Sequence, residues 1–257
     1  MYKRIIVKIG TGVISRQDGK LDSEVLKELV DQVAELRKKR VEVIIVTSGA
    51  VGTGRSLLKL DGANSVVEKQ VFAAVGQVKL MSMYSEYFGK HGFVCAQVLA
   101  TKEDFRDKEH YQNMRNCMLN LLQDNVVPVV NENDVVAVAE LVFTDNDELA
   151  GLIAEQLDVD AVIPLTSVEG VFAGDPANPG SKVIREIECS KIDSYEKYIT
   201  SDKSTSGRGG MLTKFAIAKK LCGEGIAVHI ANGHRKDVLL EIVAGNNIGT
   251  KFVPHRA

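Results

Sequence analysis

The chain has 257 residues, which suits one large α/β domain or two small ones. It is 45% hydrophobic and 26% charged, and its formal net charge of −2 excludes the basic excess that is typical of nucleic-acid-binding proteins. No apolar run approaches the ~20 residues that span a bilayer, no signal-peptide pattern follows Met1, and neither the cysteines nor the histidines have metal-site spacing, so we expect a cytoplasmic protein with no nucleic-acid or membrane partner.

The N-terminal segment predicts a buried strand followed by a helix. Residues 4–9 form a β-branched run that ends at the glycine loop of residues 10–12, as expected for a strand inside a sheet. From Val25 to Leu36 the apolar side chains recur at helical spacing, and Asp22 stands where a helix N-cap is expected. A strand and an amphipathic helix in this order begin an α/β pattern.

The same alternation continues along the chain. Residues 41–47 predict a second buried strand, which ends at a loop over residues 48–52. Residues 66–90 predict a long helix that either buries a face against another subunit or belongs to the core. Further short strands, the last two preceded by helices, are predicted at residues 93–99, 126–130 and 160–165, and another helix is predicted at residues 211–222.

This order of elements predicts an α/β protein, a three-layer αβα sandwich with a mainly parallel central sheet. In such a sheet, ligands bind beyond the carboxyl ends of the strands. The polar loops of this chain follow predicted strands, so we expect them to meet at that edge of the sheet.

Three glycine-rich loops are candidates for cradling phosphate through backbone N–H groups. They cover residues 10–12, 48–50 and 207–211, and neither standard glycine-rich nucleotide motif occurs. Lys8 lies in an apolar strand just before the first loop, and Lys214 follows the third. A lysine in an apolar strand is costly unless it reaches a partner, so we expect the two lysines to neutralise an anionic transition state. The alternatives are ordinary tight turns and solvated charges.

Two clusters of acids and amides complete the candidate site. Residues 131–134 (Asn-Glu-Asn-Asp) follow a predicted strand, and residues 145–147 (Asp-Asn-Asp) precede a helix that is expected to begin near Glu148. Helix capping explains one residue of the second cluster and leaves the others for a ligand. The Asp-x-Asp pair resembles a site for Mg²⁺ or an amine, and the missing EF-hand positions argue against calcium.

These pieces resemble the amino acid kinase family, in the family's own order along the chain, and the two acid-amide clusters favour its glutamate 5-kinase branch. The matching segments are residues 7–11 (VKIGT), 46–51 (VTSGAV), 73–77 (AAVGQ), 128–134 (PVVNEND), 145–147 (DND) and 209–214 (GGMLTK). The resemblance implies the amino acid kinase fold as a single domain, with a glutamate-binding lobe over about residues 1–158 and a nucleotide-binding lobe over residues 159–257. It also implies a form without a C-terminal PUA domain.

The resemblance implies a transferase that uses ATP and Mg²⁺ to phosphorylate the side-chain carboxylate of L-glutamate, giving L-glutamyl 5-phosphate, the first step of proline biosynthesis. The attacking oxygen is already ionised at neutral pH, so no general base is needed. Catalysis then rests on positioning and charge neutralisation. Proline as a feedback inhibitor and a homo-oligomer, either dimer or tetramer, are implied as well.

Residue roles are implied at the matching positions. Lys8 and Lys214 would bind the nucleotide phosphates and stabilise the transferring phosphoryl group, and Asp147 would organise both lysines. Glutamate would be held by Ser48, Asp134 and Asn146, with support from Asp145. The ATP contacts would come from Lys8, Gly10, Thr166, Ser167, Arg208, Gly209, Gly210, Met211, Leu212, Thr213 and Lys214. No metal-binding side chain is assigned.

The charges of glutamate suit this set. Its α-ammonium calls for a carboxylate, which Asp134 or Asp147 can supply, and its α-carboxylate calls for neutral donors such as loop N–H groups and the Asn146 amide. Two positions depart from the family pattern, because Ser167 stands where Asp is common and Thr144 where Gly is common.

Two alternative functions are weighed against this one. The first is a kinase of the same fold that acts on acetylglutamate, carbamate or a phosphorylated small molecule. Asp134 and Asp147 argue against it, because those substrates have no ammonium group to pair. The second is a non-catalytic sensor of glutamate, proline or ATP, which would not need both Lys8 and Lys214.

Overall fold

The computed structural model describes residues 2–16, 18–58, 65–136, 143, 145–175, 178, 180–198 and 210–254. The strands of its main sheet are β1 (Arg4–Ile9), β2 (Glu42–Thr47), β3 (Cys95–Ala100), β4 (Val127–Glu132), β5 (Ala161–Thr166), β8 (Glu186–Glu188), β9 (Ala227–Asn232) and β10 (Thr250–Val253). A separate two-stranded ribbon consists of β6 (Phe172–Ala173) and β7 (Lys182–Val183). The helices are α1 (Thr11–Ile14), α2 (Ser23–Lys38), α3 (Ala50–Leu57), α4 (Val66–Gly89), α5 (Lys108–Gln123), α6 (Asn146–Leu157), α7 (Met211–Gly223) and α8 (Val238–Val243), with 3₁₀ segments η1 (Glu103–Phe105) and η2 (Cys189–Tyr198).

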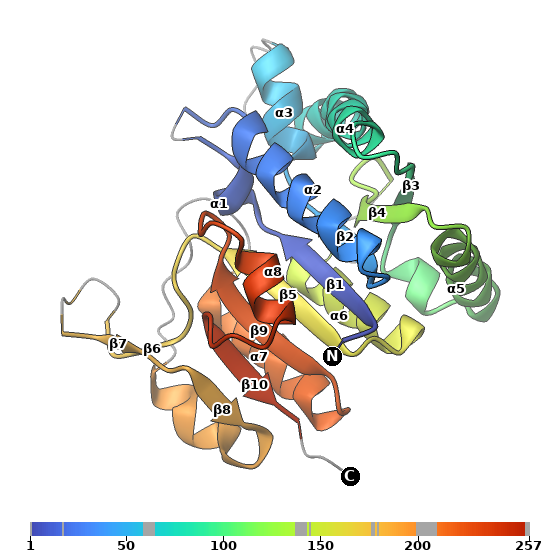
Figure 1. Ribbon diagram of the computed structural model, residues 1–257. Coiled ribbons are helices and arrows are strands. Elements are labelled where there is room, and N and C mark those ends of the chain that lie inside the picture. Colours follow the sequence, from blue (N-terminus) through green and yellow to red (C-terminus); the bar gives the residue numbers. More distant parts are fainter. Residues whose placement is uncertain are drawn as a thin grey trace.

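The main sheet has the order β3-β4-β2-β1-β5-β9-β10-β8 and carries helices on both faces (Figure 1). Its strand pairs are parallel except for β9 with β10. The predicted three-layer sandwich with a mainly parallel sheet is therefore confirmed. None of the helices in the described ranges is long and apolar enough to cross a bilayer.

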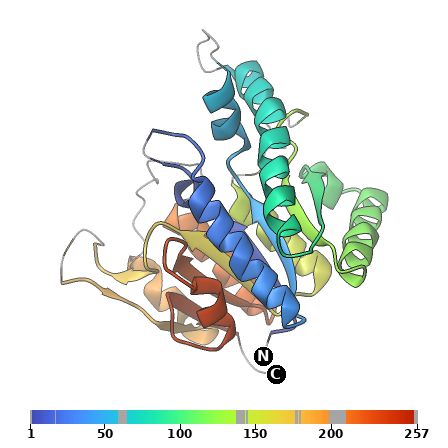
Figure 2. The same cartoon turned by 45° about the horizontal axis from the view of Figure 1, so that its top comes forward.

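Side-chain alternation along the central strand divides the core into two layers. Ile5, Val7 and Ile9 of β1 face the layer that contains α2, α4 and α8, whereas Ile6 faces the layer that contains α6 and α7. Figure 2 shows α2 and α4 lying across the first of these faces. By the same alternation, Lys8 shares the face of Ile6 and points toward α6 and α7.

The elements predicted from periodicity are confirmed within two residues at each strand end. The expected strands appear as β1 to β5, the expected helix at residues 66–90 appears as α4, and Asp22 caps α2 by accepting from the backbone N–H groups of Glu24 and Val25. Helix α3 was not predicted, because its glycines, Gly52 and Gly54, have low helix propensity. Close packing against α4 compensates for that propensity.

Two glycines allow the backbones of α3 and α4 to touch. A Cβ atom on Gly54 would collide with the carbonyl group of Phe72, and a Cβ atom on Gly76 would collide with the carbonyl oxygen of Ala50. Gly49, the residue before α3, has a φ of +100°, a conformation that side-chain-bearing residues rarely adopt. This packing fixes the loop between β2 and α3, which carries Ser48.

Candidate active site

A cavity of about 980 Å³ lies at the carboxyl ends of β1, β2, β4 and β5. It is the place where the topology of a parallel sheet predicts a ligand site. Among the residues assigned from the sequence, those that line it are Lys8, Gly10, Ser48, Asp134, Asp145, Asn146, Thr166, Ser167, Gly210, Met211 and Lys214. Segments that are up to 206 positions apart, Lys8 and Lys214 for example, therefore meet in one cavity.

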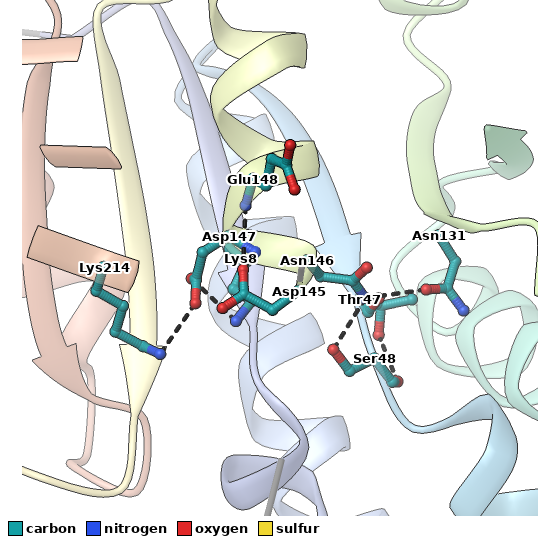
Figure 3. A network of polar contacts seen from close by, with 9 residues as sticks. All are labelled: Lys8, Thr47, Ser48, Asn131, Asp145, Asn146, Asp147, Glu148 and Lys214. Atoms are coloured by element: carbon teal, nitrogen blue, oxygen red, sulfur yellow. Dashed lines mark hydrogen bonds and ion pairs between the residues drawn. The ribbon is translucent and has the colours of Figure 1, made fainter. Parts of the chain in front are cut away.

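A buried carboxylate holds the two lysines of this cavity (Figure 3). Lys8 Nζ lies 2.9 Å from Asp147 Oδ1, and Lys214 Nζ lies 2.9 Å from Asp147 Oδ2. The three residues come from β1, from the first turn of α6 and from the first turn of α7. Their exposed fractions are 4% for Lys8, 1% for Asp147 and 6% for Lys214.

The charges of this group leave an excess of one positive unit. Burial by itself would raise the pKa of Asp147, but the ammonium groups of Lys8 and Lys214 outweigh it and lower the pKa below its ordinary value. Asp147 is therefore ionised at neutral pH, and two cations face one anion. This excess belongs to the three residues alone, because the nearby carboxyl group of Asp145 also interacts with the charges of Lys8 and Lys214.

The neighbouring carboxyl group of Asp145 caps α6. Its Oδ1 accepts hydrogen bonds from the backbone N–H groups of Asp147 at 2.8 Å and Glu148 at 3.1 Å. Burial, followed by the negative charge of Asp147, raises the pKa of Asp145. The capping contact confirms that N-capping accounts for one residue of the Asp-Asn-Asp cluster.

The residues expected to hold glutamate lie on the β2 and β4 side of the cavity. The Asn146 amide nitrogen is 2.9 Å from Ser48 Oγ, and Asp134, two residues beyond β4, lines the same cavity. Asn146 and Asp147 are consecutive residues at the start of α6, so their side chains serve the two sides of the cavity from one helical turn.

Some assigned residues lie elsewhere or cannot be placed. Two of them, Arg208 and Gly209, fall outside the described residues. The same holds for Thr144, one of the two positions that depart from the family pattern. Leu212 and Thr213 do not line the cavity, and the side chain of Leu212 is exposed. Their nucleotide contacts stay predictions.

Several cavity residues were not identified from the sequence. Arg16, Arg55 and Lys69 line the cavity, as do Asn131 and Glu132 of the Asn-Glu-Asn-Asp segment. The segment itself was a usable signal, but it does not reveal which of its side chains faces a ligand. The three basic residues have no distinguishing local pattern, because solvated charges look the same in sequence.

No group of three His, Cys, Asp or Glu side chains in the described part of the chain is placed to bind a metal ion. Asp147 already neutralises two lysines, so it is a poor candidate for an additional ion.

Sequence comparison identifies close relatives. The Amino acid kinase family profile matches residues 3–232. The chain is 49% identical to a glutamate 5-kinase of Bacteroides thetaiotaomicron, over 98% of this chain and 71% of that protein. It is 51% identical to a glutamate 5-kinase of Chlorobaculum tepidum, over 100% of this chain and 70% of that protein.

Solved structures share the fold at low identity. Carbamate kinase from Giardia lamblia, bound to AMP-PNP, superimposes with a TM-score of 0.73 at 15% identity, covering 98% of this chain and 99% of that one. UMP kinase from Bacillus anthracis superimposes with a TM-score of 0.66 at 16% identity, covering 99% and 97% of the two chains. At this identity the likeness concerns the fold alone.

Proposed function

Because the chain belongs to the amino acid kinase family, we propose that it catalyses the ATP-dependent phosphorylation of the side-chain carboxylate of L-glutamate. The observation that supports this most is the buried lysine–aspartate–lysine group, with its excess positive charge, beside a cavity lined by polar side chains. The product is L-glutamyl 5-phosphate, which supplies proline biosynthesis.

In the reaction, an oxygen atom of the glutamate side-chain carboxylate attacks the γ-phosphorus of ATP. A new C(=O)–O–P bond forms, the bond between the γ-phosphorus and the β,γ-bridging oxygen breaks, and ADP leaves with that electron pair. The attacking carboxylate carries no proton at neutral pH, so no proton has to be removed. The protein's task is to align two anions and to offset their repulsion.

Lys8 and Lys214 are suited to that task, and both are proposed as catalytic residues. They approach one carboxylate from its two oxygens, so Asp147 sets the spacing between the two ammonium groups. The fixed cations need little rearrangement when charge develops on the transferring phosphoryl group, which is how preorganised sites lower a barrier.

The substrates are assigned to the two sides of the cavity. We place glutamate in the lobe of about residues 1–158, at Ser48, Asp134 and Asn146 with Asp145 in support. The nucleotide is assigned to residues 159–257, at Thr166, Ser167 and the first turn of α7, with Arg208 and Gly209 just before it. In this arrangement the acceptor and the donor approach each other at the two lysines.

Three further assignments belong to this proposal. Mg²⁺ is expected to enter with ATP, bound by phosphate oxygens, because magnesium usually retains water and few protein ligands. Proline is expected to compete with glutamate, since it shares the α-carboxylate and a cationic amine but offers no side-chain carboxylate. A homo-oligomer is expected in solution, and sedimentation velocity separates a dimer or tetramer from a monomer.

A hydroxamate assay tests the proposal directly, because hydroxylamine traps an acyl phosphate. We expect ADP and glutamyl hydroxamate only when ATP, Mg²⁺ and L-glutamate are all present. Neither acetylglutamate nor carbamate should replace L-glutamate in the reaction. A folded protein that binds ATP and gives no hydroxamate with glutamate overturns the proposal.

Glutamate titrations at several fixed proline concentrations test the shared site for proline. We expect proline to raise the apparent KM for glutamate and to leave the maximal rate constant. A lowered maximal rate at constant KM rules out a shared site.

A further inference from the structure

Three side-chain amides form a continuous hydrogen-bonded chain behind the glutamate side of the cavity. The Asn146 amide nitrogen lies 3.0 Å from Asn131 Oδ1, and the Asn131 amide nitrogen donates to Gln77 Oε1 at 3.0 Å. Figure 3 shows Asn131, Asn146 and Ser48 converging beside the lysine group. Gln77 belongs to α4 and does not line the cavity, so it reaches the site only through Asn131.

Backbone groups at two points determine which way each amide faces. The Thr47 carbonyl oxygen can only accept, so the group of Asn146 that faces it must be the amide nitrogen. The backbone N–H of Glu132 can only donate, and it donates to Asn131 Oδ1 at 2.9 Å. The Asn131 amide nitrogen therefore faces Gln77, whose Oε1 is the acceptor.

Gln77 accepts the last hydrogen bond that fixes these amide orientations. Its exposed fraction is 8% and that of Asn131 is 3%, so water cannot readily replace either group. The Gln77 amide nitrogen points to Gln97 Oε1 at 3.4 Å, a longer contact on β3. Without the Gln77 oxygen, the Asn131 amide nitrogen would be a buried donor with no acceptor, and the Asn131 side chain would turn to find one.

The orientation of these amide groups determines which atom of Asn146 faces a ligand. Its amide nitrogen has two hydrogens and three acceptors in range: the Thr47 carbonyl oxygen, Ser48 Oγ and Asn131 Oδ1. No hydrogen remains for a substrate carboxylate. Among the described residues none donates a hydrogen bond to the Asn146 carbonyl oxygen Oδ1, so this oxygen is the atom left to accept from a ligand.

We propose that Gln77 is a positioning residue for substrate selection, which holds Asn131 and Asn146 so that the Asn146 carbonyl oxygen faces the α-ammonium group of glutamate. This inference rests on the proposed function, because it takes glutamate to be the substrate. It assigns to Gln77 a part in glutamate affinity and none in ATP affinity or in the chemical step.

The test is steady-state kinetics of Gln77→Met, which has a similar length and no hydrogen-bonding oxygen. We expect the KM for glutamate to rise about tenfold, the effect of one misplaced hydrogen-bonding group, while kcat and the KM for ATP stay within about twofold. Gln77→Glu should restore the glutamate KM to within about threefold of the parent value, because a carboxyl oxygen accepts from Asn131 whether or not the group is ionised.

Gln70→Met is the matched control, since Gln70 lies seven residues earlier on α4 and takes part in none of the hydrogen bonds of the amide chain among the described residues. It should leave all three constants unchanged. Gln77→Asn, which keeps the amide but shortens the side chain, serves as a second variant if Gln77→Met does not fold, and it should also raise the glutamate KM.

Two outcomes overturn the inference. One is an unchanged glutamate KM in a folded Gln77→Met or Gln77→Asn protein. The other is a parallel change of kcat and both KM values with no recovery in Gln77→Glu, which indicates general loosening. If the parent protein itself does not phosphorylate glutamate, the proposed function fails instead, so the two failures are distinguishable.

Discussion

Asp147 is the residue that lets two lysines share a buried site. An unpaired ammonium group inside a protein costs several kcal/mol of solvation, and two of them side by side would also repel each other. One carboxylate with a lysine on each oxygen offsets both costs. In the proposed mechanism the remaining positive charge offsets the charge of an incoming phosphate, so the contacts that stabilise the two lysines also prepare the site for its ligand.

Lys8→Ala should lower kcat by a factor on the order of 10² or more, because the proposed mechanism uses the charges of both lysines to offset the transferring phosphoryl group. Asp147 keeps its second partner, Lys214, so the fold should survive. Steady-state kinetics and circular dichroism measure the two effects separately.

Lys90→Ala is the control for that substitution. Lys90 follows the end of α4 and is paired with Glu86 at the surface. Its loss removes the same charge from a solvated position and should leave kcat unchanged. A folded Lys8→Ala protein that turns over at nearly the parent rate would contradict the catalytic role of Lys8.

At the level of elements, strand periodicity predicted the positions of the strands and also the face of the sheet on which each side chain lies. Once residues 4–9 are a buried strand, alternation places Lys8 on the face of Ile6, opposite Val7 and Ile9. The sequence does not specify which helices cover that face. The meeting of Lys8 with Asp147 and Lys214 follows from the packing of α6 and α7, and it depends on contacts between residues 139 and 67 positions apart in the sequence.

Helix α3 shows where local patterns are insufficient. Glycines at positions 52 and 54 reduce helix propensity, so propensity alone favours a loop. Gly54 is needed for a different reason, the direct contact of the α3 and α4 backbones. Tertiary packing overrides local preference here, and a single sequence carries no record of it.

Gly76→Ala should separate α3 from α4, because the new methyl group collides with the Ala50 carbonyl oxygen. We expect a loss of unfolding free energy of about 1–3 kcal/mol, as in other overpacked sites. The displaced start of α3 carries the loop of Ser48 with it, so the KM for glutamate should also rise. Urea unfolding and steady-state kinetics measure both.

Gly89→Ala is a suitable comparison on the same helix. Gly89 is the last residue of α4, and no atom lies within 4 Å of the position that its Cβ would take. That variant should lose neither stability nor glutamate affinity. Equal effects from the two substitutions would show that the close approach of α3 and α4 is not the cause.

On the scale of the whole molecule, one contact ties the N-terminal residues to the second half of the sheet. The Tyr2 hydroxyl group lies 2.7 Å from Nε2 of His229, a residue of β9 whose exposed fraction is 4%. Burial, assisted by the positive charge of Lys251, lowers the pKa of His229 to about 4 from its ordinary value of 6.5. The folded protein therefore holds this histidine neutral across the physiological range.

Unfolding should consequently depend on pH. The unfolded chain binds a proton at His229 below about pH 6.5, whereas the folded chain resists it until about pH 4. The stabilisation is complete above pH 6.5 and declines as the pH falls from 6.5 to 4. From the two pKa values, about 2 kcal/mol of unfolding free energy should be lost between pH 7.5 and pH 5.

Urea unfolding of His229→Gln at both pH values tests this contribution. Glutamine cannot take up the proton, so the variant should lose less stability than the parent protein on acidification, by about the same 2 kcal/mol. His234→Gln changes an exposed histidine nearby and should keep the parent's pH dependence. An identical slope in parent and His229→Gln would show that His229 titrates normally in the folded state.

The sequence predicted the fold of the whole molecule and several of the residues that line the cavity, but not the hydrogen-bonded network behind it. Lys8, Ser48, Asp134 and Lys214 stand next to strand ends or glycine loops, and that position is visible in sequence. Gln77 lies in the middle of a long helix among apolar residues. Its contact with Asn131 depends on how α4 rests on the sheet, which no local pattern specifies.

The position of β1 also has a consequence for synthesis on the ribosome. β1 is made first and pairs with β2 on one side, but its other edge pairs with β5, which begins 114 residues after the end of β2. At about 5–20 residues per second, that edge waits roughly 5–25 s for its partner. An unpaired apolar strand edge is a template for wrong pairing, so the nascent chain is most vulnerable to aggregation while residues 48–160 are being translated. Lys8 likewise has no carboxylate partner in this incomplete sheet until Asp147 has been made.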